Sequence, residues 1–322
     1  MICGVCGFGE DEMKKIRILL ATYNGEKYLG AMIDSILAQD YTNWELIISD
    51  DGSTDKTVEV IGQYVQLFPT KIIFYQSGKK FGGAKYHFMH LLEYFADAEY
   101  IMFADQDDIW HSDKITKTWN RMLELETEEK RPILVHTDLR VVDEQLNCLN
   151  ASFMQFSNLD GNRLKLNNLL IQNVVTGCTV MINQELIKMV VDKIPQEGMR
   201  MHDWWLALAA ATCGTIGFVE EATIDYRQHG TNTVGAKNSR SLKYIYERIF
   251  SGENYLAIKY TFMQADTLRN CFGDLMPEKA FKLVCIHADL LHANPVKRRA
   301  TYIRYGIFKK GIGRKIGQLI YG

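Results

Sequence analysis

Short apolar runs that alternate with amphipathic segments are the feature that most constrains the fold of this chain. The runs that read as strands are IRILLATY, WELIISDD, KIIFYQS and YIMFAD. The segments between them, 26–40, 53–68 and about 83–96, have helical spacing, with Ser53 or Thr54 as the cap of the second. Buried strands separated by helices predict a mainly parallel sheet with helices on both faces, a Rossmann-like α/β fold.

Polar clusters follow three of these predicted strands. Their sequences are ATYNG, SDDGSTD and ADQDD. The carboxyl ends of parallel strands meet at one edge of a sheet, and ligands bind beyond that edge. We therefore expect one binding site built from all three clusters.

The third cluster is acidic and contains Asp105, Asp107 and Asp108. In an extended segment, residues two apart project to the same side, so Asp105 and Asp107 present their carboxylates together. Close like charges need a cation, and carboxylate oxygens suit Mg²⁺ or Mn²⁺, which also bridge phosphates. An isolated acidic pair is more often a helix cap or a solvated turn. The first strand is followed by neither a dinucleotide-binding glycine motif nor a P-loop, so a nucleotide must be held in another way.

Composition and length describe an ordinary globular chain of 322 residues. No apolar run reaches the roughly 18 residues of a spanning helix, and the N-terminus lacks a secretory signal, so we expect a cytoplasmic protein. The seven cysteines are scattered and read as reduced thiols. Residues 1–12 match no strand or helix period. We expect a disordered extension there, or a true start at Met13.

The C-terminal tail concentrates positive charge. Residues 297–322 contain eight Lys or Arg and no acid, interleaved with aromatic and aliphatic residues. This pattern is typical of a membrane surface segment, here at the inner face of the cell membrane. A solvated basic helix or a weak nucleic-acid patch would carry the same charges. Of these partners we expect the membrane and no nucleic acid.

An ordered series of motifs carries a family resemblance. The motifs are ATYNGEKYLGAMIDSILAQDYTNWELIISDDGSTDKT, FADQDDIWHSDKI, TGCTVMIN, HDWW and YRQHGTNTVG. Together they resemble glycosyltransferase family 2, and closely its bacterial rhamnosyltransferase-type branch. The resemblance implies a GT-A fold that uses a nucleotide-sugar donor and inverts the anomeric centre. It places the catalytic domain at 13–236, followed by a helical C-terminal region at 237–322.

The first two motifs supply the expected nucleotide site. By resemblance, Thr22 and Tyr23 contact the base, and Asn24 belongs with them among the donor-binding residues. Asp51 is implied to accept a hydrogen bond from the imide N–H of a pyrimidine. Taken without the other motifs, Asp50 and Asp51 are more readily explained as turn formers before Gly52.

The resemblance also assigns the metal and diphosphate region. Asp105 is implied to face the ribose and the metal, and Asp107 to bind Mg²⁺ or Mn²⁺ directly. In YRQHG, His229 is expected near the metal or diphosphate, with Arg227 neutralising charge nearby. A lone histidine is more often structural.

The remaining motifs are expected to line the sugar and acceptor pocket. Thr176 and Gly177 are candidates, although a tight turn before a core strand explains them equally well. His202 and Asp203 stand before an apolar helical run, where a carboxylate is usually a cap. The family pattern instead makes Asp203 the catalytic base. Trp204 either shapes a sugar platform or fills core space.

These expectations combine into one function. The chain is predicted to be an inverting, metal-dependent glycosyltransferase. It would move L-rhamnose from dTDP-L-rhamnose to a lipid-linked saccharide in cell-surface polysaccharide synthesis, such as O-antigen. A nucleotidyltransferase on a similar sheet is the first alternative, but no Gly-rich, Lys- or Arg-bearing loop follows the first strand. A non-catalytic sugar-binding or scaffold relative is the second, although both Asp107 and Asp203 are present.

Overall fold

The computed structural model describes residues 13–126, 130–229 and 253–321. The predicted extension at 1–12 and the predicted boundary at 236/237 lie outside these residues. The strands are β1 Ile16–Thr22, β2 Trp44–Asp50, β3 Ile72–Phe74, β4 Tyr100–Asp105, β5 Ile109–Trp110, β6 Ile133–Val142, β7 Cys148–Asn150, β8 Met181–Asn183 and β9 Thr215–Arg227.

Helices connect and cover these strands. Those of the first two thirds of the chain are α1 Leu29–Leu37, α2 Thr57–Leu67, α3 Ala84–Tyr94, α4 Lys114–Leu125, α5 Phe153–Phe156, α6 Leu166–Leu169, the 3₁₀ turn η2 Gly177–Thr179, α7 Gln184–Val191 and α8 His202–Cys213. The C-terminal ones are α10 Glu253–Phe272, α11 Glu278–Ala288, η3 Asp289–His292, α12 Pro295–Tyr305 and α13 Ile312–Tyr321.

The described strands form one sheet in the order β3-β2-β1-β4-β8-β6-β9-β5, with β7 paired to β6. The first four are mutually parallel, as predicted. β8 then runs antiparallel to both β4 and β6, and β6 is parallel to β9. The predicted α/β architecture is confirmed, with a mixed second half that the sequence pattern did not reveal.

Helices cover both faces of the sheet. Successive residues of a strand point to opposite sides, so each strand packs against helices on both faces. Leu19 of β1 packs in a core with α3 and α8, whereas its neighbours Ile18 and Leu20 pack with α1 and α4. Each of these three side chains is fully buried. This explains why the strands read as continuous apolar runs.

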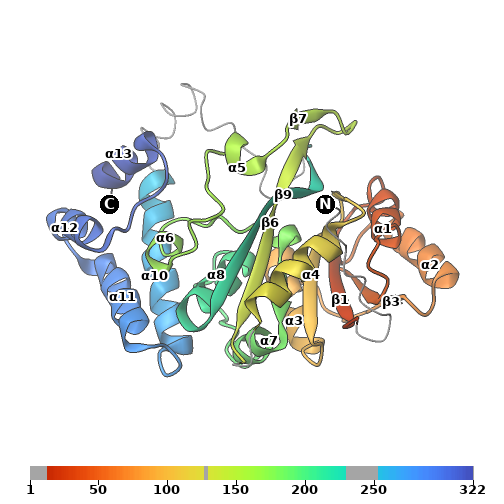
Figure 1. The fold of residues 1–322 in the computed structure, drawn as a ribbon, viewed down its shortest axis with the longest axis horizontal. Helices are drawn as coiled ribbons and strands as arrows, with labels where there is room; N and C mark the ends of the chain where they lie inside the picture. Colours follow the sequence, from red (N-terminus) through yellow and green to blue (C-terminus); the bar gives the residue numbers. More distant parts are fainter. Residues whose placement is uncertain (1–12, 127–129, 230–252, 322) are drawn as a thin grey trace, which may run out of the picture.

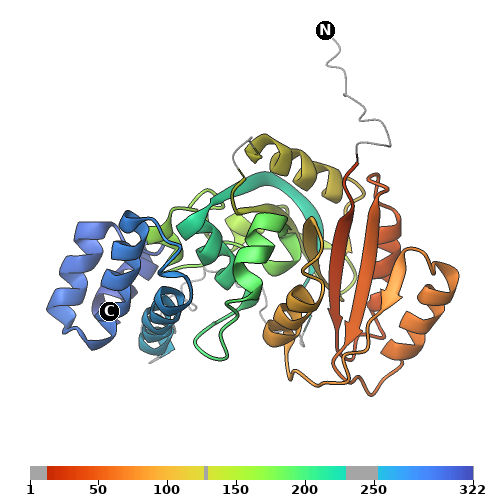
Figure 2. The ribbon, with the colours of Figure 1, turned by 90° about the horizontal axis from the view of Figure 1, so that it is seen from below.

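The C-terminal helices form a further layer beside the sheet. Figure 1 shows α10, α11, α12 and α13 at one end of the molecule, with β1, β3, α1 and α2 at the other, and Figure 2 shows the same separation. Phe262 and Tyr302 lie in a small core of this layer. Leu268 and Phe272 of α10 instead join the main core with Trp205 of α8. The predicted helical C-terminal region is confirmed over residues 253–321.

No helix in the ranges described is both long and apolar enough to cross a membrane.

Candidate functional site

The three polar clusters meet at one edge of the sheet, as predicted. In the parallel register, Thr22 is the partner of Asp50, and Ala21 is the partner of Asp105. Gln106 continues this alignment beyond the strands. Its side chain accepts a hydrogen bond from the Tyr23 amide at 2.9 Å and donates one to the Tyr23 carbonyl at 3.0 Å. The backbone after β1 is thereby fixed to the acidic cluster after β4.

Asn24 links the same loop to the cluster after β2. It adopts a left-handed backbone, with φ of 47°, which asparagine tolerates better than most residues. Its amide donates to the Ser53 hydroxyl and its side-chain oxygen accepts from the Thr54 amide, both at 2.8 Å. The prediction that Ser53 or Thr54 caps the next helix is therefore wrong. α2 begins at Thr57, without a side-chain cap, because both residues are bonded to Asn24.

The residues predicted to contact the nucleotide's pyrimidine base lie close together but differ in solvent exposure. Thr22 is buried, and its hydroxyl donates to Asp50 at 2.9 Å, whereas Tyr23 is 55% exposed. Asp51 is buried, and its two carboxylate oxygens accept from the amides of Phe81 and Gly83. The loop before α3 is thus attached to Asp51. Each carboxylate oxygen can accept more than one hydrogen bond, so Asp51 keeps acceptor capacity.

Asp107 and His229, 122 residues apart, lie in direct contact. The His229 Nε2 atom is 2.7 Å from Asp107 Oδ2. Tyr28 stacks on the His229 ring, with 4.9 Å between the ring centroids. The Arg227 guanidinium lies over the Tyr28 ring and donates to the Asp107 carbonyl at 2.9 Å. Its Nη1 donates to the Glu144 carbonyl at 2.6 Å. The end of β9 therefore positions a cation and an imidazole beside the acidic cluster.

Three titratable groups in and next to this cluster are buried: Asp108, Lys114 and Cys178. Burial raises the pKa of Asp108 well above its ordinary value, and the charges of Asp107 and Asp105 add to the effect. Burial lowers the pKa of Lys114 to about 8. Within the described residues, the Lys114 ammonium has no hydrogen-bond partner, but it lies 4.7 Å from the centre of the Trp110 ring.

The acidic cluster offers carboxylate oxygens, which hard divalent cations prefer. Burial first, and then the charges of Asp107 and Asp203, raise the pKa of the Asp105 carboxyl to about 7. A cation among these carboxyls would offset their repulsion, and carboxylate oxygens and an imidazole nitrogen are ligand types that Mn²⁺ accepts. Among the described residues, however, Asp105, Asp107 and His229 do not bring their ligand atoms within 4.8 Å of one another. Asp105, Asp108 and Cys178 bring ligand atoms within 4.8 Å of one another. That deeper group includes a soft thiol and is less suited to these ions.

Asp203 lies at the start of α8, and its carboxylate is held by backbone amides. Oδ2 accepts from the Gly177 amide at 3.1 Å and Oδ1 from the Trp204 amide at 2.5 Å. Burial raises the pKa of Asp203 to about 7, although these hydrogen bonds oppose the shift. Such a carboxylate changes protonation near neutral pH, as a general base requires. Thr176 stands beside it as the residue before the η2 turn.

Two residues predicted near the acceptor lie in the core. His202 is buried against Phe88, with 4.5 Å between the ring centroids, and burial lowers its pKa to about 3. It is therefore a neutral packing residue. Trp204 is 9% exposed, and its Nε1 donates to the Leu169 carbonyl at 2.7 Å. This placement favours core filling, the alternative left open for Trp204, over a sugar platform.

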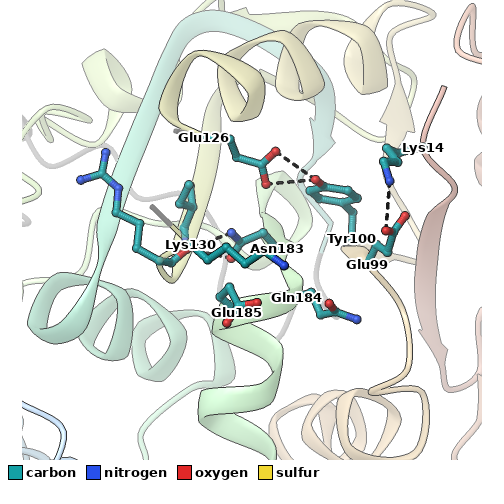
Figure 3. A pocket seen from close by; sticks show the side chains of 10 residues that line it. Lys14, Glu99, Tyr100, Glu126, Lys130, Asn183, Gln184 and Glu185 are labelled. Atoms are coloured by element: carbon teal, nitrogen blue, oxygen red, sulfur yellow. Dashed lines mark hydrogen bonds and ion pairs between the residues drawn. The ribbon is translucent and has the colours of Figure 1, made fainter. Parts of the chain in front are cut away.

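A separate cavity of about 260 Å³ lies at the opposite edge of the sheet, where β1 and β4 begin (Figure 3). Its wall carries paired groups. The Tyr100 hydroxyl donates to the Glu126 carboxylate at 2.9 Å, and Lys14 pairs with Glu99 at 3.1 Å. Because this cavity lies at the other end of β4 from Asp105, we assign the chemistry to the strand-end cluster instead.

Sequence reasoning missed three residues that shape the site. Gln106 stands inside the acidic motif itself, so its position was a usable signal. Tyr28 and Glu144 offered none, because they reach Arg227 and His229 only through the tertiary fold. Glu144 is 116 residues from Tyr28, whose hydroxyl donates to its carboxylate at 3.0 Å.

Comparison with known proteins agrees with this geometry. Residues 17–128 match the model of the family described as Glycosyl transferase family 2. The dTDP-rhamnosyl transferase RfbG of Shigella flexneri is 29% identical over 240 residues, which cover 70% of this chain and 76% of that protein.

Two solved structures share the fold. TarS 1-349 of S. aureus in complex with UDP-GlcNAc has a TM-score of 0.52 at 17% identity, covering 95% of this chain and 91% of that one. The mannosyltransferase PcManGT of Pyrobaculum calidifontis, in complex with GDP-Man and Mn²⁺, has a TM-score of 0.53 at 18% identity. It covers 90% of this chain and 73% of its own. These likenesses confirm the GT-A fold.

Gly177 is expected to be essential for the position of Asp203. A Cβ atom at this glycine would lie 2.6 Å from His202 Nε2 and 3.7 Å from Asp203 Cβ. Because His202 is buried, Gly177→Ala must displace the start of α8. We expect catalytic turnover to fall by about 10²-fold, since a 1 Å misplacement costs that much. Steady-state kinetics measure this effect.

Gly62→Ala on α2 is the matched control, because its added Cβ meets no atom within 4 Å. It should keep full turnover. Wild-type turnover in Gly177→Ala would contradict the role given to this turn.

Proposed function

We propose that the chain is a glycosyltransferase, with a family 2 domain at residues 17–128, and that it transfers L-rhamnose from dTDP-L-rhamnose to a lipid-linked saccharide. The observation that carries the proposed mechanism is the separation of two carboxylate environments at one edge of the sheet. Asp107 is bonded to His229, whereas Asp203 is held by the Gly177 amide. The surroundings of Asp107 suit the leaving diphosphate, and the position of Asp203 suits the attacking hydroxyl.

The proposed nucleotide site lies between the loops after β1 and β2. The exposed Tyr23 ring supplies a surface for the base, and Asn24 and the buried Thr22 hold the loop that carries it. Asp51 accepts the imide N–H of a pyrimidine in addition to the two amides of the loop before α3. The thymine of a dTDP donor offers such a donor group. The similarity to a dTDP-rhamnosyl transferase supports this choice of nucleotide and sugar.

The proposed diphosphate site uses the front of the acidic cluster. Asp107 and His229 would hold Mg²⁺ or Mn²⁺, with Asp105 facing it and the ribose. When bound, such a cation neutralises negative charge on the departing diphosphate. Arg227 supplies a fixed positive charge beside the same group, since its guanidinium is bonded to the carbonyls of Asp107 and Glu144. The protein thereby keeps the diphosphate on the side of the sugar that faces β4 and β9.

Asp203 is proposed as the general base. Its carboxylate takes the proton of the acceptor hydroxyl as the hydroxyl oxygen bonds to the anomeric carbon and the bond to the diphosphate breaks. Attack opposite the leaving group inverts the anomeric centre. Gly177, with Thr176 beside it, lines this side of the site. His202 and Trp204 contribute by packing beneath the start of α8.

The acceptor is proposed to be a growing cell-surface polysaccharide, such as O-antigen, on a lipid carrier at the cytoplasmic face of the membrane. The basic tail at 297–322, which suits an anionic membrane surface, supports this choice of acceptor. No nucleic-acid partner is part of this proposal.

The donor assignment predicts selective turnover of dTDP-L-rhamnose. We expect release of dTDP from this donor, and little release of nucleoside diphosphate from UDP- or GDP-sugars. The Asp51 contact suits a pyrimidine imide, which thymine and uracil share, so discrimination against UDP-sugars must come from the sugar pocket. A coupled nucleoside diphosphate assay over a donor panel measures this. Exclusive turnover of a UDP-hexose would overturn the rhamnose assignment and leave the fold and the catalytic residues in place.

The metal assignment predicts loss of turnover with EDTA and recovery with Mg²⁺ or Mn²⁺. Asp107→Asn should lower turnover by at least about 10²-fold, because stabilising the leaving group is worth several kcal/mol. Thermal unfolding should change little, since the Asp107 side chain is at the partly exposed rim. Asp97→Asn, which changes an exposed carboxylate elsewhere, is the control. Full turnover in excess EDTA would refute the metal requirement.

The base assignment predicts a pH dependence. Because burial raises the pKa of Asp203 to about 7, the basic form is lost as pH falls below 7, and kcat/KM should rise with pH through that value. Asp203→Asn should lower transfer by about 10² to 10⁴-fold with donor binding unchanged. Glu278→Gln, at the start of α11, controls for loss of a carboxylate in a first helical turn. Near wild-type transfer by Asp203→Asn would make Asp203 a helix cap only.

A further inference from the structure

Helices α12 and α13 present apolar stripes to solvent. On α13, Ile312, Ile316 and Ile320 are 80%, 46% and 51% exposed. Side chains four residues apart lie along one side of a helix. On α12, Val296 and Ile303 are 73% and 69% exposed, and their spacing of two turns also places them on one side. Such rows differ from the scattered exposed apolar residues of an ordinary surface.

Exposed cations flank both stripes. They are Lys297, Arg299 and Arg304 on α12 and Lys315 on α13. The sequence has no acid after Asp289, so no carboxylate of either helix neutralises them. The surface of the two helices therefore combines apolar side chains with unneutralised positive charge.

Other contacts fix these helices to the catalytic part of the chain. Arg314 of α13 donates to the carbonyls of Ser157 and Asn158, each at 2.7 Å. Arg299 of α12 donates to the Leu319 carbonyl at 2.7 Å, so the exposed side of α12 borders the end of α13. A ligand on this surface would therefore hold the whole enzyme in one orientation.

We propose that the outer surface of α12 and α13 binds an anionic phospholipid bilayer. The surface is defined by Val296, Ile303, Ile312, Ile316 and Ile320 with the four exposed cations. Helices that lie in a membrane interface place their apolar side chains at the headgroup–acyl boundary and their cations on the headgroups. Anionic lipid complements the charge, whereas a second copy of the same cationic face would repel it. The inference rests on the proposed function in one respect: binding to the bilayer would bring the enzyme to a lipid-linked acceptor.

Vesicle flotation of the full chain tests the proposal. Wild-type protein should float with phosphatidylcholine vesicles that contain phosphatidylglycerol and not with phosphatidylcholine alone. The triple variant Lys297→Gln/Arg304→Gln/Lys315→Gln should partition roughly 100-fold more weakly at about 0.1 M salt. Each cation near an anionic surface contributes about a fivefold factor. About 1 M salt should weaken the wild type similarly, because it shortens the Debye length.

The apolar part has its own variant and controls. Ile312→Asp/Ile316→Asp should also abolish flotation, and both positions are exposed enough to tolerate the change in the folded chain. Leu67→Asp, at a site 70% exposed on α2, matches the apolar change. Lys165→Gln/Lys188→Gln/Lys279→Gln matches the charge change at exposed lysines elsewhere. Both controls should float like the wild type.

Several outcomes would overturn the proposal. They are equal binding to neutral and anionic vesicles, wild-type flotation of either surface variant, and equal loss in the controls. A concentration-dependent dimer that Ile316→Asp dissociates in sedimentation would assign the face to a second copy. Donor turnover on a lipid-free acceptor is measured separately. If the protein binds vesicles but does not turn over the donor, the proposed function is overturned and the surface assignment stands.

Discussion

The parallel register of β2, β1 and β4 is the constraint on which the site depends. Backbone hydrogen bonds place Thr22 beside Asp50 and Ala21 beside Asp105, so three loops leave the sheet at the same level. A slip of one residue would turn every side chain of a strand to the other face. Asn24 and Gln106 then bond the three loops to one another. The site is rigid because its loops begin from a fixed edge and are cross-linked within a few residues.

Electrostatics divides the acidic residues at this edge into different roles. The Asp107 carboxylate is in contact with His229, and the Asp107 backbone carbonyl accepts from the Arg227 guanidinium. The Asp203 carboxylate accepts from the amides of Gly177 and Trp204, and burial raises its pKa to about 7. The two carboxylates therefore have different surroundings, which is the basis for proposing that Asp107 binds a cation and that Asp203 accepts a proton.

The C-terminal layer supports the helix that carries the proposed base, Asp203. Trp205 follows the start of α8 closely and packs on Phe272 of α10, with 5.5 Å between the ring centroids. The helix that carries Asp203 is thus supported from behind by the C-terminal region. The same region holds α12 and α13, so the residues that support the base and those that we expect to contact lipid belong to one packed layer.

The sequence by itself determined the α/β class, the strands that end in polar clusters and the identity of the acids at the edge. Local periodicity and backbone chirality are sufficient for these features, because each depends on residues near one another in the chain. Asp105 and Asp107 were therefore predictable as candidates, whereas Asp203 by itself reads as a helix cap. Family resemblance singled out Asp203 and implied a role for each of the three, which periodicity could not.

Only the tertiary structure decided which distant groups meet. The contact of His229 with Asp107, the stacking of Tyr28 on that histidine, and the burial of Trp204 all join segments far apart in sequence. The tertiary structure also decided that β8 pairs with β4 in the antiparallel direction. The physical reason is that pKa values, ion contacts and burial depend on every group within a few ångströms, and chain folding rather than local sequence sets those neighbours.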